Sequence, residues 1–206
     1  MKTVGIIAEF NPLHNGHKYL LDEAKRLSGA DFCIVVMSGN FVQRGSPALL
    51  DKYTRTQMAL LNGVDLVIEL PVIYATASAE YFARGAVRLL DKLGVVDIIT
   101  FGSECGNIEL LKKAATELTE ETPDFKKNLQ DNLKKGLSFP KARSQAIGKQ
   151  GDGSEPNNIL GIEYIKALNY WDSSITPTTI ERKGSGYHDE QMASATAIRK
   201  MEFTVV

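Results

Sequence analysis

Cysteine is scarce in this chain, with only Cys33 and Cys105 among 206 residues. Two cysteines cannot form a disulfide framework, and Cys33 lies in an apolar run of the kind that buries a thiol. No stretch approaches the roughly 20 apolar residues that a bilayer-spanning helix needs. No basic region, apolar core and cleavage site precede the first predicted strand. We therefore expect a reduced, cytoplasmic protein without a membrane partner.

An excess of either charge is also absent. Lys and Arg number 24 against 25 Asp and Glu, for a net charge of -1. Nothing in the overall charge indicates nucleic acid, so RNA contact must come from a local patch or from a segment outside this sequence. The 43% hydrophobic and 24% charged composition excludes wholesale disorder and fibrous repeats. The length suits one α/β domain with a small appendage.

Several common catalytic signatures are missing. No Walker-type Gly-x-x-x-x-Gly-Lys-Ser/Thr follows a predicted strand, and no Gly-x-Gly-x-x-Gly follows the first one. No Gly-x-Ser-x-Gly offers a nucleophile elbow. His14 and His17 are close enough to share an ion, but zinc needs three or four ligands, and His188 and the cysteines follow no ligand spacing. The sequence predicts no protein-held metal site.

Short apolar runs alternate with helical patterns through the first hundred residues, and one further run follows near the end. This alternation predicts parallel strands covered by helices on both faces. Right-handed crossovers then give a doubly wound, Rossmann-like α/β sheet of about five strands. The expected strands are Thr3–Phe10, Asp31–Met37, Val64–Leu70, Val95–Phe101 and Ile175–Glu181, and the first three helices are Gly16–Leu27, Asp51–Leu61 and Ser78–Leu93.

The second half is more polar and more helical. We interpret the whole chain, 1–206, as one nucleotidyltransferase-like domain with a helical insertion at about 107–150. The helices expected there are Glu109–Leu118, Asp124–Lys135 and Pro140–Gln150, followed by Asn158–Asn169 and a Ser-capped helix Ser194–Met201.

Ligands of doubly wound sheets bind outside the carboxyl ends of the strands, where the strand order reverses. The loops expected to form the ligand site are therefore Asn11–Asn15, Ser38–Leu50, Pro71–Ala77 and Gly102–Asn107.

The sharpest local signal is His14-Asn15-Gly16-His17, set between the first strand and the first helix. Gly16 permits close backbone approach, and the helix turns its free N–H groups and positive dipole end toward the loop. Two imidazoles there can hydrogen-bond phosphate oxygens and neutralise charge on a leaving pyrophosphate. An ordinary βα turn with two surface histidines is the alternative.

A second anion site is predicted at Ser194-Ala195-Thr196-Ala197-Ile198-Arg199. Thr196 and backbone N–H groups supply donors, and Arg199 offers a bidentate fork for phosphate. A plain helix cap with a solvated Arg199 is the alternative.

Three weaker signals remain open. In the loop Ser38–Gly45, Asn40, Gln43 and Arg44 could bind acetate, an α-phosphate or a base, or could be solvated. Lys52 and Arg55, one helical turn apart, indicate either anion contact or a surface salt bridge. The basic run Lys126–Lys149 suits an RNA backbone or is a solvated helix face.

The His-x-Gly-His and Ser-x-Thr-x-Ile-Arg pair resembles the nucleotidyltransferase-like superfamily. Longer blocks resemble more closely the bacterial tRNA(Met) cytidine acetate ligase family, over residues 3 to about 200. These blocks are GIIAEFNPLHNGHKYLL, VVMSGNFVQRGSPALLDKYTRTQMAL, GVDLVIELP, TFGSECG, KKGLSFPKA and EPNNILGIEYIKAL.

This resemblance implies a ligase that activates acetate with ATP and acetylates N4 of the wobble cytidine (C34) of elongator tRNA(Met). Mg²⁺ is expected because it accompanies ATP. From the residue chemistry we expect His14, His17 and Arg199 to be the catalytic residues. The implied ATP contacts are Ile7, Ala8, Glu9, Phe10, Asn11, Pro12, Leu13, His14, Asn15, Gly16, His17, Lys18, Tyr19, Leu20, Gly102, Asn157 and Arg182, to which the residue chemistry adds Thr196. Asn158 is as plausible a contact as Asn157.

The resemblance also implies a C-terminal tRNA-binding region, which we expect this chain to lack. Two other functions stay open: a nucleotidyltransferase that adenylates a phosphate-bearing metabolite, and a catalytically silent nucleotide- or RNA-binding module.

Overall fold

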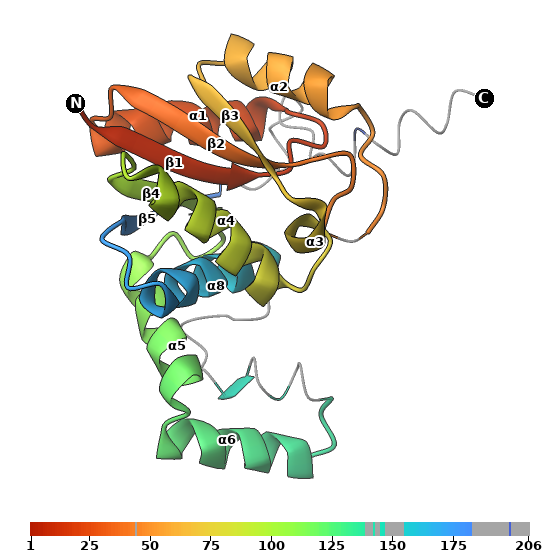
Figure 1. Cartoon of the computed structure of the whole chain (residues 1–206). Helices are drawn as coiled ribbons and strands as arrows, with labels where there is room; N and C mark the ends of the chain where they lie inside the picture. Colours follow the sequence, from red (N-terminus) through yellow and green to blue (C-terminus); the bar gives the residue numbers. More distant parts are fainter. Residues whose placement is uncertain (44, 139–141, 143–144, 147–154, 183–197, 199–206) are drawn as a thin grey trace, which may run out of the picture.

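Runs of β-branched and apolar residues form a five-stranded sheet, and amphipathic segments form the helices around it (Figure 1). The computed structural model describes residues 1–43, 45–138, 142, 145–146, 155–182 and 198. The strands are β1 Thr3–Ala8, β2 Phe32–Ser38, β3 Leu66–Leu70, β4 Ile98–Ser103 and β5 Thr176–Glu181. The helices are α1 Asn15–Ser28, α2 Lys52–Leu61, α3 Val72–Ala75, α4 Ala79–Leu93, α5 Ile108–Glu120, α6 Pro123–Lys134 and α8 Pro156–Tyr170.

The strands lie in the order β3-β2-β1-β4-β5, and all of them are parallel. This confirms the predicted doubly wound sheet. The chain builds outward from β1 through β2 to β3, then returns to the other side of β1 for β4 and β5. The strand order therefore reverses between β1 and β4, which is where such a sheet binds its ligand.

The two strands at this reversal separate toward their carboxyl ends. β1 pairs with β2 along its whole length, from Thr3–Phe32 to Ala8–Met37. Its pairing with β4 comprises only Val4–Ile98 and Gly5–Ile99. A crevice can therefore open between the last residues of β1 and β4.

Alternation along the strands divides the core into two layers. Ile6 and Val35 face α1 and α2, together with Leu21 and Ala59. Neighbouring strand residues such as Ile7 and Val36 face the opposite layer, which is built with α4, α5 and α8. Figure 1 shows α1 and α2 on one side of the sheet and α4 and α8 on the other.

Aspartates set the amino-terminal boundaries of the strands. The carboxylates of Asp31, Asp65 and Asp97 accept the N–H groups of Lys2, Cys33 and Thr3, at 2.8, 2.8 and 2.7 Å. β3 and β4 consequently begin two and three residues later than predicted. At the other end, β1 stops at Ala8 instead of Phe10, because Phe10 turns into the left-handed region with φ 46°.

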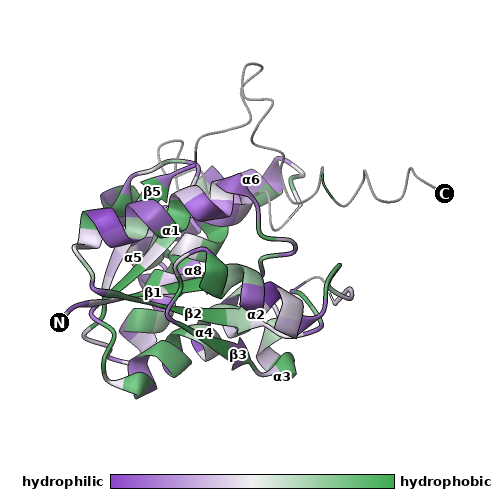
Figure 2. Cartoon of the chain, turned by 90° about the horizontal axis from the view of Figure 1, so that it is seen from above, coloured by the Kyte–Doolittle hydropathy of each residue, from purple (hydrophilic) through white to green (hydrophobic). Residues whose placement is uncertain are grey.

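The segment between β4 and α8 contains α5 and α6. α5 packs against α8 through Leu111, Ala114 and Ala115. Figure 1 shows α6 far from the sheet, and Figure 2 shows it largely hydrophilic. The predicted helices Pro140–Gln150 and Ser194–Met201 lie mostly outside the described residues. The short helix α3 was not predicted.

Cys33 is fully buried, as its apolar run predicts. In the part of the chain that the structure describes, no helix is both long and apolar enough to cross a membrane.

Candidate active site

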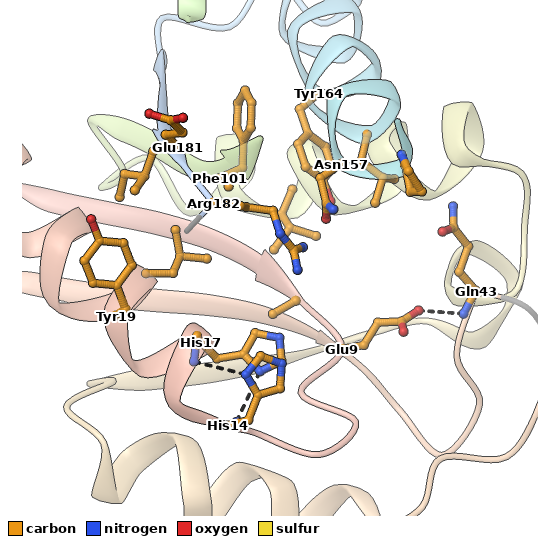
Figure 3. Close-up of a pocket in the computed structure, with 18 of the residues that line it drawn as sticks. Glu9, His14, His17, Tyr19, Gln43, Phe101, Asn157, Tyr164, Glu181 and Arg182 are labelled. Atoms are coloured by element: carbon orange, nitrogen blue, oxygen red, sulfur yellow. Dashed lines mark hydrogen bonds between the residues drawn. The ribbon is translucent and has the colours of Figure 1, made fainter. Parts of the chain in front are cut away.

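A cavity of about 480 Å³ opens at the reversal point, beside the carboxyl ends of β1, β4 and β5. Its walls come from both halves of the sheet, from the start of α1 and from one face of α8 (Figure 3). The lining residues are Ile7, Ala8, Glu9, His14, Gly16, His17, Tyr19, Leu20, Gln43, Phe82, Phe101, Gly102, Pro156, Asn157, Leu160, Tyr164, Ile180, Glu181 and Arg182.

The two histidines form the cap of α1. Nδ1 of His14, the N-cap residue, accepts the N–H of Gly16 at 3.1 Å. Nδ1 of His17 accepts the N–H of His14 at 3.3 Å. Together they make a capping box in which imidazoles replace the usual hydroxyl and carboxylate. Because both Nδ1 atoms act as acceptors, each neutral ring carries its hydrogen on Nε2, where it can donate to a ligand.

The environment keeps both rings neutral. Burial lowers the pKa of His17 to about 3, assisted by the charges of His14 and Arg182. Burial and then Arg182 also lower the pKa of His14. In the ligand-free protein the rings are therefore neutral hydrogen-bond donors and not cations. Of the two roles predicted from the sequence, hydrogen bonding to phosphate oxygens fits this state, and charge neutralisation by the imidazoles does not.

This neutral pair predicts an acid-sensitive fold. Between about pH 6.5 and about pH 3, the unfolded chain holds a proton on His17 that the folded chain excludes, because burial lowers the pKa of His17 to about 3 in the folded state. Stability is therefore complete above about pH 6.5 and falls as the pH drops toward about 3, by about 1.4 kcal/mol per pH unit from His17 alone. Urea unfolding from about pH 7 to about pH 4 measures the slope. His17→Gln is the control, since a slope identical to the wild type would assign the acid sensitivity to other groups.

Arg182 supplies the permanent positive charge. It directly follows β5, and its N–H donates to the carbonyl of Ser103 at 2.9 Å. Its side chain crosses Gly102, where an added Cβ would lie 3.2 Å from the Arg182 Cγ. Figure 3 shows the guanidinium directed from the β5 side toward His14 and His17. A ligand placed between them would meet two neutral donors and one cation.

Asn157 and Asn158 have different positions. Asn157 lines the cavity, and its Nδ2 donates to Oε1 of Glu104 at 2.5 Å. Asn158 is buried, and its Oδ1 accepts the N–H groups of Glu104 and Cys105. Asn158 therefore ties the loop after β4 to the start of α8, while Asn157 is the residue that can meet a ligand.

The predicted contacts divide into lining and supporting residues. The residues of the predicted set that line the cavity are Ile7, Ala8, Glu9, His14, Gly16, His17, Tyr19, Leu20, Gly102, Asn157 and Arg182; those that do not are Phe10, Asn11, Pro12, Leu13, Asn15 and Lys18. Phe10 is fully buried with its ring 5.1 Å from that of His17, and Asn11 Oδ1 accepts the N–H of Leu49. Arg44, Thr196 and Arg199 lie outside the described residues.

Sequence reasoning missed most of the apolar wall. Phe101 and Tyr164 lie with ring centroids 5.5 Å apart, beside Phe82 and Leu160. Phe101 could have been found, because it lies near the carboxyl end of a predicted strand. Phe82, Leu160 and Tyr164 lie on α4 and α8, where helical periodicity marks a core-facing stripe without showing which part of it meets a cavity.

Arg55 is not the exposed anion contact or salt bridge that its spacing from Lys52 suggested. It is fully buried, and its guanidinium donates to the carbonyls of Leu50, Glu9, Ser38 and Gly39. It thereby joins the end of β1 to the loop after β2. Lys52 forms a salt bridge with Glu69, with Nζ 2.6 Å from Oε2, which confirms the salt-bridge alternative for this residue.

A doubly wound parallel sheet with a His-x-Gly-His helix start at its reversal point defines an α/β protein of the nucleotidyltransferase class. A profile of the HIGH Nucleotidyl Transferase family matches residues 1–204, and the chain belongs to this family.

The similar curated proteins share one name. A tRNA(Met) cytidine acetate ligase of Caldanaerobacter subterraneus subsp. tengcongensis is 56% identical over 97% of this chain and 53% of its own length. One of Clostridium perfringens is 52% identical over 99% of this chain and 56% of its own. A crystal structure of Thermotoga maritima TmcAL bound with alpha-thio ATP superposes with a TM-score of 0.89 at 44% identity, covering 100% of this chain and 51% of that one. The chain thus spans about half the length of the curated relatives it matches.

Proposed function

We propose that this chain activates acetate with ATP and transfers the acetyl group to N4 of the wobble cytidine (C34) of elongator tRNA(Met). The observation that carries the proposal is the convergence of His14, His17 and Arg182 on one cavity. The names of the relatives and the ATP analogue bound to Thermotoga maritima TmcAL support the choice of substrates.

The first step needs charge stabilisation rather than a protein nucleophile. A carboxylate oxygen of acetate attacks the α-phosphorus of ATP, and the bond from that phosphorus to the bridging oxygen breaks to release pyrophosphate. The Nε2–H groups of His14 and His17 donate to the phosphate oxygens, and Arg182 balances their charge. Thr196 and Arg199 belong to the same proposal as further phosphate ligands.

The nucleoside would lie toward Gly102. The absence of a side chain at Gly102 leaves backbone exposed to a ribose or base, with Tyr19, Leu20 and Ile180 as apolar neighbours in the cavity wall. The residues from Ile7 to Leu20 that do not line the cavity would act by holding this loop in place.

Magnesium would enter on the phosphates of ATP. Mg²⁺ prefers oxygen ligands and usually combines phosphates and water with one or two carboxylates. Among the described residues no three His, Cys, Asp or Glu side chains gather into a metal site, so phosphate and water would supply most ligands.

The RNA would approach the helical segment after β4. Lys126, Lys127, Lys134 and Lys135 belong to α6 or its C-cap and are exposed. Such a cluster suits a phosphate backbone. We propose residues 107–150 as a helical insertion that faces tRNA, within a single domain of residues 1–206.

Exchange of labelled pyrophosphate into ATP, without tRNA, tests the first step. We expect exchange that requires acetate, because only a reversible acetyl-adenylate returns the label to ATP. Omitting acetate is the control. ATP binding without acetate-dependent exchange would contradict the proposal. It would favour an adenylyltransferase for a phosphate-bearing metabolite, or a silent nucleotide-binding module.

A further inference from the structure

One carboxylate in the cavity has no evident use in the activation step. Glu9 directly follows β1 and is half-buried, and its Oε1 accepts the backbone N–H of Gln43 at 2.8 Å. Figure 3 shows Glu9 and Gln43 at one end of the cavity and Tyr19 and Glu181 at the other, with His14, His17 and Arg182 between them. The second carboxylate oxygen, Oε2, is the one that can meet a substrate.

The chemistry of the two steps differs in its need for a base. ATP and acetate are both anions, so a nearby carboxylate opposes their binding. The attack of acetate on ATP also moves no proton. The attack of an exocyclic amine on an acyl-adenylate does, because the amine must lose a proton as the new amide forms.

We propose that Glu9 is the general base of acetyl transfer and that Glu9 and Gln43 together hold the amino edge of the target cytosine. This assignment rests on the proposed function and adds a catalytic residue for its second step. A Glu carboxylate is the natural acceptor for the N4 amine of cytosine. The side-chain amide of Gln43 can donate to the neighbouring ring nitrogen.

The step balances without another reactant. The N4 lone pair attacks the acetyl carbonyl carbon and forms the C–N bond. The bond from that carbon to the phosphate oxygen then breaks, and AMP leaves with the electron pair. One N4 proton passes to Oε2 of Glu9 and from there to solvent.

The surroundings of Glu9 hold this base in place. Arg55 donates to the backbone carbonyl of Glu9 at 2.7 Å, and Gln43 donates to its carboxylate, so both ends of the residue are fixed. Tyr164, from α8, is buried beside it, and burial followed by the charge of Glu9 raises the pKa of that phenol. Arg55 of α2 and Tyr164 of α8 are thus the titratable neighbours whose charges couple to Glu9. Arg182 faces the cavity from the end of β5.

Glu9→Gln removes the proposed base but keeps the hydrogen bond that ties residue 9 to Gln43. The amide oxygen of the substituted side chain can still accept the N–H of Gln43, so the loop keeps its tie while the base is lost. The probe is an anticodon stem-loop RNA with cytidine at the wobble position, and mass spectrometry reads its acetylation. We expect the ratio of acetyl transfer to pyrophosphate exchange to fall by about 100-fold or more, the usual contribution of a general base. The exposed Glu109→Gln is the control and should keep the wild-type ratio.

Each other result has a distinct meaning. Equal losses of exchange and transfer in Glu9→Gln would place the carboxylate on ATP and overturn the assignment. A wild-type ratio of transfer to exchange in Glu9→Gln would overturn it too. Absence of acetate-dependent exchange in the wild type would instead remove the proposed function on which it rests.

Discussion

His14→Asn is expected to reduce acetate-dependent pyrophosphate exchange by about 100- to 1,000-fold, the usual cost of removing one donor from developing charge. Asparagine is among the best N-cap residues, so its side chain can still accept the N–H of Gly16. What disappears is the Nε2–H directed into the cavity. His17→Gln is the matching change, because glutamine at the third helical position completes a capping box.

The decisive comparison is between activity and stability. His14→Asn and His17→Gln should unfold in urea near the wild-type midpoint at neutral pH, whereas His14→Ala should lose about 1 kcal/mol with its cap. Exchange rates measured at saturating ATP give the activity. Near-wild-type exchange by His14→Asn would show that the histidine only caps the helix.

Arg55→Met is expected to destabilise the fold by about 3 to 5 kcal/mol, because it leaves several backbone carbonyls without their donor, at about 1 to 3 kcal/mol for each buried group left unsatisfied. Methionine retains much of the aliphatic volume but leaves the carbonyls of Leu50, Glu9, Ser38 and Gly39 without this donor. Because three of these carbonyls lie where β1 and β2 end, the loops that carry Glu9 and Gln43 should loosen as well.

Lys52→Ala provides the control on the same helix. Lys52 pairs with Glu69 near the surface, where such pairs contribute about 0 to 1 kcal/mol. Equilibrium unfolding in urea of the two variants and the wild type gives the difference. If Arg55→Met lowered the free energy of unfolding by less than about 1 kcal/mol, water would be replacing the guanidinium, and Arg55 would contribute little to stability.

The parts predicted well from sequence depend on local patterns. Apolar runs such as Phe32–Ser38 can be buried only inside a covered parallel sheet, and helices alternate with them at short intervals. The position of the cavity then follows from topology, because carboxyl ends and the reversal of strand order place it next to His14 and His17.

The parts that sequence could not predict depend on what a side chain meets in three dimensions. Arg55 looks like a surface residue on α2, yet four backbone carbonyls converge on it from elsewhere. Asn157 and Asn158 are chemically identical, and only the loop after β4 distinguishes them through Glu104. Tyr164 joins the cavity because α8 packs across β4, which no pattern within α8 reports.

Because the pairing between β1 and β4 ends early, a bound ligand would connect the two halves of the sheet. Beyond Gly5 and Ile99, β1 is hydrogen-bonded only toward β2, and β4 only toward β5, within the described strands. Glu9, His14 and His17 thus belong to one half of the sheet, and Gly102 and Arg182 to the other. A nucleotide held by both sets would bridge a seam that the backbone leaves open. Tighter substrate binding would therefore also hold the two halves of the sheet together more strongly.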